Sequence, residues 1–311
     1  MKKIICLFFT FTLVICISFS QTVEELLKIG DRYILEGQLH EARLVVKETI
    51  RLNPNNAISY FHLGSIYYRL GNITLAMKSF SRVIELDNYF AEAYFWRAVL
   101  YDEYLNDYTR AICNYNMAIY LEPENDRFHR GRGVFLYTVV GNFESAFIDL
   151  NRAVEIDSLN YLNFLERGEF HSTIGRFEIA LDDFNAAIKL NAEYTRIFSN
   201  KGVTLAFLGR YEEAIENFDI ALQLDNSNYI AYFERGSVHF ELGMYNEAVL
   251  DFTEVIRLNP NFRDYRYAYI NRAHSFRRLA GQTDDPVQAF YYLNMALQDE
   301  EIVTRFDGQR E

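Results

Sequence analysis

The chain has 311 residues, half of them hydrophobic, and carries a formal net charge of −12 from 31 basic and 43 acidic residues. Its 26 phenylalanines and 23 tyrosines supply ample apolar surface for a core, which excludes an intrinsically disordered chain. An acidic chain repels the phosphate backbone of DNA and RNA, so nucleic-acid binding is not expected.

The first twenty residues differ in composition from the rest of the chain. Two lysines precede an apolar run over residues 4–17, and the small residues Ser18 and Ser20 follow it. A charged start, an apolar middle and a small-residue end are typical of a secretory signal peptide. We therefore expect residues 1–20 to be a signal peptide and the protein to be exported, either to the periplasm or out of the cell. The alternative is an uncleaved N-terminal membrane anchor, although the run is shorter than the roughly 20 residues of a spanning helix.

Cysteine usage agrees with a protein that is stabilised by packing. Cleavage after residue 20 would remove Cys6 and Cys16 and leave Cys113 as the only thiol. An internal disulfide is then impossible. We expect Cys113, which lies between Ile112 and Asn114 in a predicted helix, to be a buried and unreactive side chain.

An alanine recurs at nearly constant spacing along the rest of the chain. The intervals between successive members are 34, 35, 35, 34, 34, 34 and 41 residues. The alanines are Ala42, Ala76, Ala111, Ala146, Ala180, Ala214, Ala248 and Ala289. A fixed period in this range is typical of stacked supersecondary units.

Other positions keep register with these alanines. A small residue precedes each alanine by 12 or 13 positions in the first seven units and by 16 in the eighth, and a bulky residue follows each alanine by four. These intervals match the period of a helix and not the alternation of a strand. Each unit therefore predicts two helices, with the small residue where they cross and a turn residue between them. The turn residues are Gly37, Gly71, Asn106, Gly141, Gly175, Gly209, Gly243 and Gly281.

The sixth unit shows the pattern most clearly. Its matching residues are Phe198, Gly202, Leu205, Gly209, Tyr211, Ala214, Phe218 and Ala221. This pattern resembles the tetratricopeptide repeat (TPR) family from residue 23 to about residue 300. The resemblance implies an all-α fold, a right-handed superhelical solenoid of about eight helix-turn-helix units over residues 21–300. The expected units are 23–56, 57–90, 91–125, 126–160, 161–194, 195–228, 229–262 and 263–300. A C-terminal tail over 301–311 would either cap the array or mark a self-association surface.

Three units depart from the regular period. The third and the fourth carry one extra residue between the small residue and the alanine, and the eighth carries four, around residues 282–286. Three more extra residues lie within 261–269. We expect the last unit to be rotated or looser than its neighbours.

The residue pattern offers no candidate for catalysis. The six histidines form no HExxH motif and no clustered pair suited to a metal, and no GxSxG motif occurs. His171 and His239 take a position that Tyr or Leu fills in other units, so packing explains them. We expect no enzyme activity, no catalytic residues, no cofactor and no metal.

A basic residue directly precedes the small residue in six units. These residues are Arg97, Arg132, Arg167, Lys201, Arg235 and Arg272. Asp149, Asp183 and Asp251 lie one position before the bulky residue of the second helix. Because both sets recur in register, we expect structural ion pairs and not a ligand site.

The resemblance implies that the first helices of successive units line a concave groove that binds a peptide. Carried over position by position, the groove contacts include Phe61, Tyr68, Phe95, Arg127, Arg130, Tyr137, Leu165, Arg196, Phe207, Phe233 and Phe240, with Ser65, Glu169, Ser237 and Glu241 among the polar positions. Aromatic side chains are frequent binding anchors. We therefore expect protein or peptide partners with apolar anchors of their own. The Lys and Asn of the family's carboxylate clamp are absent, because Phe61 and Ser65 stand there in the second unit.

Five arginines fall within sixteen residues near the C-terminal end, against an acidic background. Of these, Arg266, Arg277 and Arg278 are candidates for an anion-docking surface. A solvated helix face is the alternative.

Together these features favour an exported scaffold or adaptor that binds peptide segments in a concave groove. The alternative is a non-catalytic accessory subunit of a cell-envelope enzyme or of a secretion or assembly complex. Association with membrane-bound complexes and self-association are both compatible with the sequence.

Overall fold

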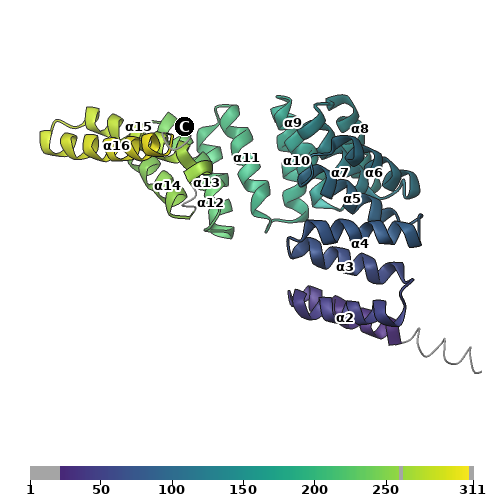
Figure 1. The fold of residues 1–311 in the computed structure, drawn as a ribbon. Coiled ribbons are helices and arrows are strands. Elements are labelled where there is room, and N and C mark those ends of the chain that lie inside the picture. The colour runs from purple at the N-terminus through teal and green to yellow at the C-terminus, as the bar shows by residue number, and fades with distance from the viewer. Residues whose placement is uncertain (1–21, 259–261, 308–311) are drawn as a thin grey trace, which may run out of the picture. The chain divides into compact units, whose positions relative to one another are not determined.

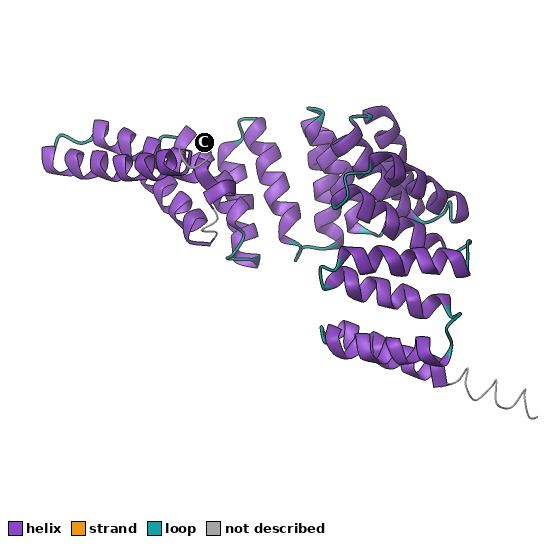
Figure 2. Ribbon diagram, viewed as in Figure 1, coloured by secondary structure: helices purple, strands orange, loops and turns teal. Residues whose placement is uncertain are grey.

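The computed structural model describes residues 22–258 and 262–307, and these residues form helices joined by turns and short loops, without a strand (Figure 2). The predicted signal peptide over residues 1–20 lies outside the described residues. Within the described ranges, no helix combines the length and the apolar character needed to span a membrane. The chain divides into two compact units, one ending at Ile156 and one beginning at Asp157, and each is described by itself.

The first unit is an array of helix pairs (Figure 1). Helical residues 22–35 pair with α2 (Leu39–Leu52), with Gly30 against Val46. The following helices are α3 (Ala57–Arg69), α4 (Ile73–Leu86), α5 (Ala91–Glu103), α6 (Tyr108–Leu121), α7 (Asp126–Phe135), the π-helix η1 (Leu136–Val140) and α8 (Phe143–Ile156). The side chains of Asn56, Asn72 and Asp107 cap α3, α4 and α6 by accepting hydrogen bonds from backbone N–H groups of the first turn.

The second unit continues the same arrangement. Its helices are α9 (Tyr161–Thr173), α10 (Phe177–Leu190), α11 (Thr195–Phe207), α12 (Tyr211–Leu224), α13 (Tyr229–Glu241), α14 (Tyr245–Leu258), α15 (Phe262–Gln282) and α16 (Pro286–Asp307). Consecutive helices pack against each other throughout, and α15 and α16 lie side by side as a long hairpin (Figure 1). The predicted all-α solenoid of eight helix pairs is confirmed within the described residues.

Sterics explain the small residue at each helix crossing. A Cβ atom added to Gly64 would lie 2.6 Å from the ring of Phe80, and one added to Gly202 would lie 2.7 Å from the ring of Phe218. Both phenylalanines are fully buried, four residues after a fully buried alanine of the repeat. A larger side chain at the glycine would push the two helices apart, so the glycine and the phenylalanine together define the crossing.

The extra residue of the third and fourth units is accommodated in two different ways. In the fourth unit it widens the end of the first helix into the π-helix η1. In the third unit it lengthens the turn after α5, where Asn106 has a φ of 51°, the one positive φ among the non-glycine residues described. Asparagine tolerates this left-handed conformation better than most residues.

The last helix pair departs from the predicted register. Ala289, expected at the crossing, is partly exposed, and Leu293, expected in the core, is 41% exposed. Ala296 is fully buried instead and packs in one cluster with Ala273 and Phe276. The reason is helix length, because α15 and α16 have 21 and 22 residues where the other regular pairs have 13 and 14. The extra residues extend both helices beyond the crossing and do not lengthen the turn.

Two other expectations about this pair are also corrected. Gly281, expected in the turn, lies inside α15 and lacks the positive φ of the turn glycines, and residues 283–285 form the turn. Residues 301–307, expected to belong to a separate tail, continue α16.

Cys113 is exposed, contrary to the expectation of a buried thiol. The inward positions of α6 are taken by Ala111, Asn114, Tyr115 and Ala118, which leaves Cys113 on the solvent side of that helix.

Candidate peptide-binding site

The first helices of successive pairs form one continuous surface in the second unit. Helix α9 contacts α11, α11 contacts α13, and α13 contacts α15. The face of these helices carries several of the predicted groove positions, among them Glu169, Arg196, Ser237, Phe240 and Glu241.

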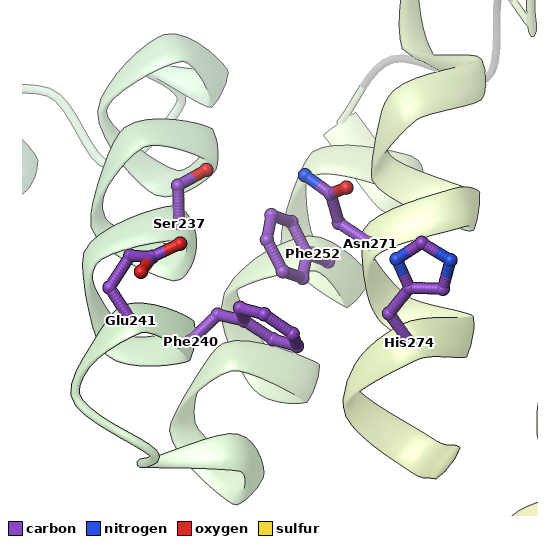
Figure 3. A pocket seen from close by; sticks show the side chains of 6 residues that line it. All are labelled: Ser237, Phe240, Glu241, Phe252, Asn271 and His274. Carbon is purple, nitrogen blue, oxygen red and sulfur yellow. The ribbon is translucent and has the colours of Figure 1, made fainter. Parts of the chain in front are cut away.

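A pocket of about 270 Å³ opens between α13 and α15 (Figure 3). Its lining consists of Ser237, Phe240 and Glu241 from α13, Phe252 from α14, and Asn271 and His274 from α15. The ring of Phe252 is fully buried and lies between the two walls. The volume is just below the roughly 300–1,000 Å³ that is usual for small-molecule pockets, which suits one side chain of a peptide better than a cofactor.

The side chains that line this pocket differ in how firmly they are held. Phe240 packs edge-on against Tyr245 with ring centres 5.3 Å apart, and Ser237 donates a 2.9 Å hydrogen bond to the carbonyl of Phe233. Within the described part of the chain, the side chains of Glu241 and Asn271 make no hydrogen bond. The pocket therefore combines a fixed apolar floor with polar groups at the rim that a ligand can use.

Arg196, a predicted groove residue, is paired within the unit. Its guanidinium donates to Glu169 at 2.6 Å and to Glu166 at 3.1 Å, and Asn200 also donates to Glu169. Burial and then the neighbouring Glu166 raise the pKa of Glu169 to about 7, against the opposing effect of Arg196. Two carboxyl groups thus face one guanidinium, and this site does not attract an anionic ligand.

The predicted arginines of the first unit are paired in the same way. Arg127 donates to Glu92 at 3.1 Å and lies 4.6 Å from the ring centre of Phe95. Arg130 pairs with Asp126 at 3.2 Å. The three arginines of the predicted groove all have carboxylate partners, and for Arg127 and Arg196 these lie on another helix, which the sequence positions alone did not indicate.

Several predicted groove residues belong to the core. Phe95, Tyr137 and Leu165 are 6%, 9% and 0% exposed, so they are unavailable to a peptide. The cause is clear for Phe95, which stacks on Phe128 and lies where a Cβ atom at Gly131 would come within 2.6 Å of its ring.

The remaining predicted aromatic residues keep part of their surface. Phe61, Tyr68, Phe233 and Phe240 are partly buried, and each contacts another aromatic ring. Phe207 is 68% exposed at the end of α11, with its ring stacked on that of Phe177.

A second acidic region lies at the C-terminal ends of α3 and α5. The hydroxyl of Tyr68 donates to Glu103 at 3.4 Å. Burial, and then the charge of Glu103, raise the pKa of Asp102 to about 6.

The predicted ion pairs form between the two helices of a pair. They are Arg132 with Asp149, Arg167 with Asp183 and Arg235 with Asp251, and Arg272 forms a further pair with Asp299. Burial alone would raise the pKa of Asp149, but hydrogen bonds and positive charge from Arg132 and His129 keep it below its usual value. These aspartates are buried, so the pairs stabilise the crossing and are not a ligand site.

The candidate anion-docking arginines do not converge on one point. Arg277 forms two hydrogen bonds of 2.8 and 2.7 Å with Glu300, which offsets its charge. Arg266, partly buried, lies eleven residues before it, which is roughly 16 Å along a helix. Arg278 is exposed and points about 100° away from Arg277 around the helix. The solvated-face alternative fits this arrangement better than a single anion site.

Sequence reasoning missed half of the pocket, namely Phe252, Asn271 and His274. A signal for the last two was present, because Arg272 and Ala273 repeat the Arg235 and Gly236 of the preceding unit. Asn271 lies one residue before this pair and His274 one residue after it, as Glu234 and Ser237 do in the preceding unit. Over the described residues, no group of three His, Cys, Asp or Glu side chains is placed to bind a metal ion.

Family models match four stretches of the chain. A model described as TPR repeat matches residues 30–71 and 207–243, and models described as tetratricopeptide repeat match residues 57–90 and 229–262. Among curated proteins, Hsp70-Hsp90 organizing protein 3 of Arabidopsis thaliana is 27% identical over 108 residues. That match covers 35% of this chain and only 19% of the length of the relative.

Two crystal structures show the same fold. A tetratricopeptide repeat protein from Parabacteroides merdae is 21% identical, with a TM-score of 0.63, over 80% of this chain and 97% of that one. The APC/C hetero-tetramer Cut9-Hcn1 contains a chain that is 18% identical, with a TM-score of 0.68, over 81% of this chain and 48% of that one. The repeat register, the glycine-phenylalanine crossings and these matches lead to one conclusion, that the chain belongs to the tetratricopeptide repeat family.

Proposed function

We propose that this protein is a non-catalytic adaptor that binds a peptide segment of a partner protein along the first helices of its second unit. The observation that carries the proposal is the pocket between α13 and α15, which has a buried aromatic floor and an unpaired carboxylate and amide at its rim. Repeat arrays bind through such extended surfaces. The pocket is sized for one apolar side chain of the peptide.

Charge supports a preference for basic residues beside that apolar side chain. Glu241 stands at the rim of the pocket, and Glu166 and Glu169 outnumber the one arginine, Arg196, that pairs with them. A lysine or arginine of the peptide would gain a partner at either place, whereas an acidic residue would be repelled. The preferred ligand is therefore an apolar residue flanked by basic ones.

The test is to select random phage-displayed peptides on the full chain and to measure the affinity of the enriched peptides by calorimetry. We expect an apolar residue with a neighbouring Lys or Arg, and we expect Ser237→Leu, which fills the pocket, to weaken binding about tenfold or more. Ser65→Leu is the matched control, because Ser65 occupies the same repeat position and also donates to a carbonyl four residues earlier. Failure to enrich any peptide, or equal effects of the two substitutions, would argue against the proposal.

We also propose that the protein is exported, because the composition of residues 1–20 matches a signal peptide. N-terminal sequencing of the protein purified from its host tests this. A mature chain that begins at Gln21 would support export with cleavage, whereas an intact Met1 would contradict cleavage.

A further inference from the structure

Helix α16 presents an apolar face that no described residue covers. Val287, Phe290, Tyr291, Leu293 and Leu297 are 75%, 71%, 56%, 41% and 51% exposed. At about 100° per residue they fall within roughly 160° of the helix circumference, an arc that also holds the uncharged polar residue Asn294. The opposite side packs against α15 through Tyr292, Met295 and Ala296.

This face lies largely on the part of the hairpin that extends the repeat. The crossing of the last pair is at Ala273 and Ala296, so the first ten residues of α16, 286–295, lie on the turn side of it. A regular repeat has only about one turn of helix there, as the three residues of α14 before Ala248, residues 245–247, illustrate. The extension therefore adds apolar surface that the repeat itself does not require.

The composition of the face separates it from the outward surface of α14. No charged residue occurs from Pro286 to Gln298, although 24% of the chain is charged. For comparison, Leu250 on α14 is 67% exposed, but Glu247, Glu254 and Arg257 share that helix with it. Charges return on α16 only from Asp299 onward.

We propose that this face of α16 binds the same face of a second copy of the chain, so that two hairpins pack as a four-helix arrangement. In a contact between identical surfaces, every residue near the two-fold axis meets its own copy, so a charge there would be repelled. The absence of charge over 286–298 suits a second copy better than a charged partner.

The exposed area is sufficient for such a contact. Aromatic side chains bury about 150–250 Å² each, so Phe290 and Tyr291 at their exposed fractions supply roughly 200–300 Å² per copy, and the three smaller aliphatic side chains bring the total to roughly 500 Å². Two copies then bury about 1,000 Å², which is near the lower limit for a specific interface. The dimer is accordingly a dissociable one.

A membrane surface is the competing occupant. Helices that bind membrane surfaces usually carry Lys or Arg on their polar face, to attract anionic lipids. Residues 286–298 contain neither, and Asp299, Glu300 and Glu301 follow them. The observations therefore favour the second copy.

Sedimentation velocity of the purified full chain over a range of concentrations tests the proposal. We expect a monomer–dimer equilibrium in which Phe290→Asp weakens association about tenfold or more, while Leu250→Asp leaves it unchanged. Both positions are exposed, and circular dichroism of each variant checks that its helix content is unchanged. Because the N-terminal residues are the same in all three proteins, differences between them report on α16.

A monomer at every concentration would overturn the proposal. So would a dimer that Phe290→Asp does not weaken, or one that both substitutions weaken equally. Co-sedimentation with phosphatidylcholine vesicles is the second measurement. If the protein stays monomeric in solution but binds vesicles, and Phe290→Asp abolishes that binding, then the face of α16 binds a lipid surface and not a second copy.

Discussion

Arg235 on α13 and Asp251 on α14 are joined by two hydrogen bonds of 3.1 and 2.6 Å, and His239 lies 2.9 Å from the same carboxylate. Asp251 is 3% exposed, so its carboxylate contacts the guanidinium of Arg235 and the imidazole of His239, both on the facing helix, inside the core. The pair lies next to the crossing of Gly236 over Phe252. It therefore fixes how the two helices meet, without taking part in ligand binding.

Removing this carboxylate is expected to destabilise the second unit. Asp251→Ala leaves His239 without its acceptor and Arg235 with only the partly exposed Asp219, and loss of one partner of a buried pair costs about 3 kcal/mol. Urea unfolding followed by circular dichroism measures the loss. Glu254→Ala is the control, because its exposed pair with Arg257 contributes at most about 1 kcal/mol. Equal losses of stability in the two variants would show that the buried Asp251 contributes no more than an exposed carboxylate. We also expect neither substitution to change the affinity for selected peptides.

The third unit lacks the aspartate that this ion pair needs, and restoring it is expected to stabilise the protein. Asn114 stands at the position of Asp149 in the next unit, and its Oδ1 atom and the Nε atom of Arg97 are both buried without a hydrogen-bond partner. Asn114→Asp would lose the 2.8 Å bond from its amide to the carbonyl of Arg110 and gain a charge-assisted pair with Arg97. We expect a net gain of about 1 kcal/mol in the free energy of unfolding.

Thermal and urea unfolding of Asn114→Asp measure this gain. Asn55→Asp, in the loop between α2 and α3, is the control, because it adds the same charge at an exposed position. A lower stability for Asn114→Asp than for this control would mean that the buried arginine does not find the new carboxylate.

The raised pKa of Asp102 predicts that the free energy of unfolding decreases as the pH rises. Burial and then Glu103 raise its pKa from 3.8 to about 6, so the folded state binds the proton more tightly than the unfolded state. The free energy of unfolding therefore falls as the pH rises from about 4 to about 6, and this loss is complete above that range. Asp102→Asn should remove it, so that the variant matches the parent near pH 3.5 and exceeds it at pH 7 by roughly 1 kcal/mol, a figure reduced for solvent screening because Asp102 is partly exposed.

Urea unfolding of Asp102→Asn and the parent at several pH values checks this expectation. Asp182→Asn, at an exposed position of α10, controls for the loss of one negative charge. A difference between Asp102→Asn and the parent that stays constant from pH 3.5 to pH 7 would contradict the assignment.

The repeat itself was predictable because its cause is local. A glycine and a phenylalanine sixteen residues apart, such as Gly64 and Phe80, indicate one helix crossing. The recurrence of the alanines indicates how many crossings there are. Which groove positions stay exposed depends instead on the neighbouring helix pair. Phe95 is buried because Gly131, 36 residues later, leaves room for its ring.

The pairing of Arg127 and Arg196 was unpredictable for the same reason, whereas Arg130 pairs with Asp126 four residues earlier on the same helix. The partner of Arg127 lies 35 residues away and the partners of Arg196 lie 27 and 30 residues away, so the contacts depend on how successive pairs stack. The register of the last unit failed differently. The extra residues there can be accommodated by a longer turn, which would place Ala289 at the helix crossing, or by two longer helices, which place Ala296 there. The sequence contains an alanine at both positions and so does not distinguish the two arrangements.

The corrected register of the last pair predicts that Gly281→Ala stabilises the protein. Gly281 lies inside α15 without a positive φ, and a Cβ atom added there would meet nothing within 4 Å. Alanine in place of glycine in a helix then gains roughly 0.5–1 kcal/mol. At the turn glycine Gly209, whose φ is 72°, the same substitution should cost about 1 kcal/mol or more. Urea unfolding of the two variants separates the cases by sign, and a loss of stability in Gly281→Ala would return Gly281 to the turn and Ala289 to the helix crossing.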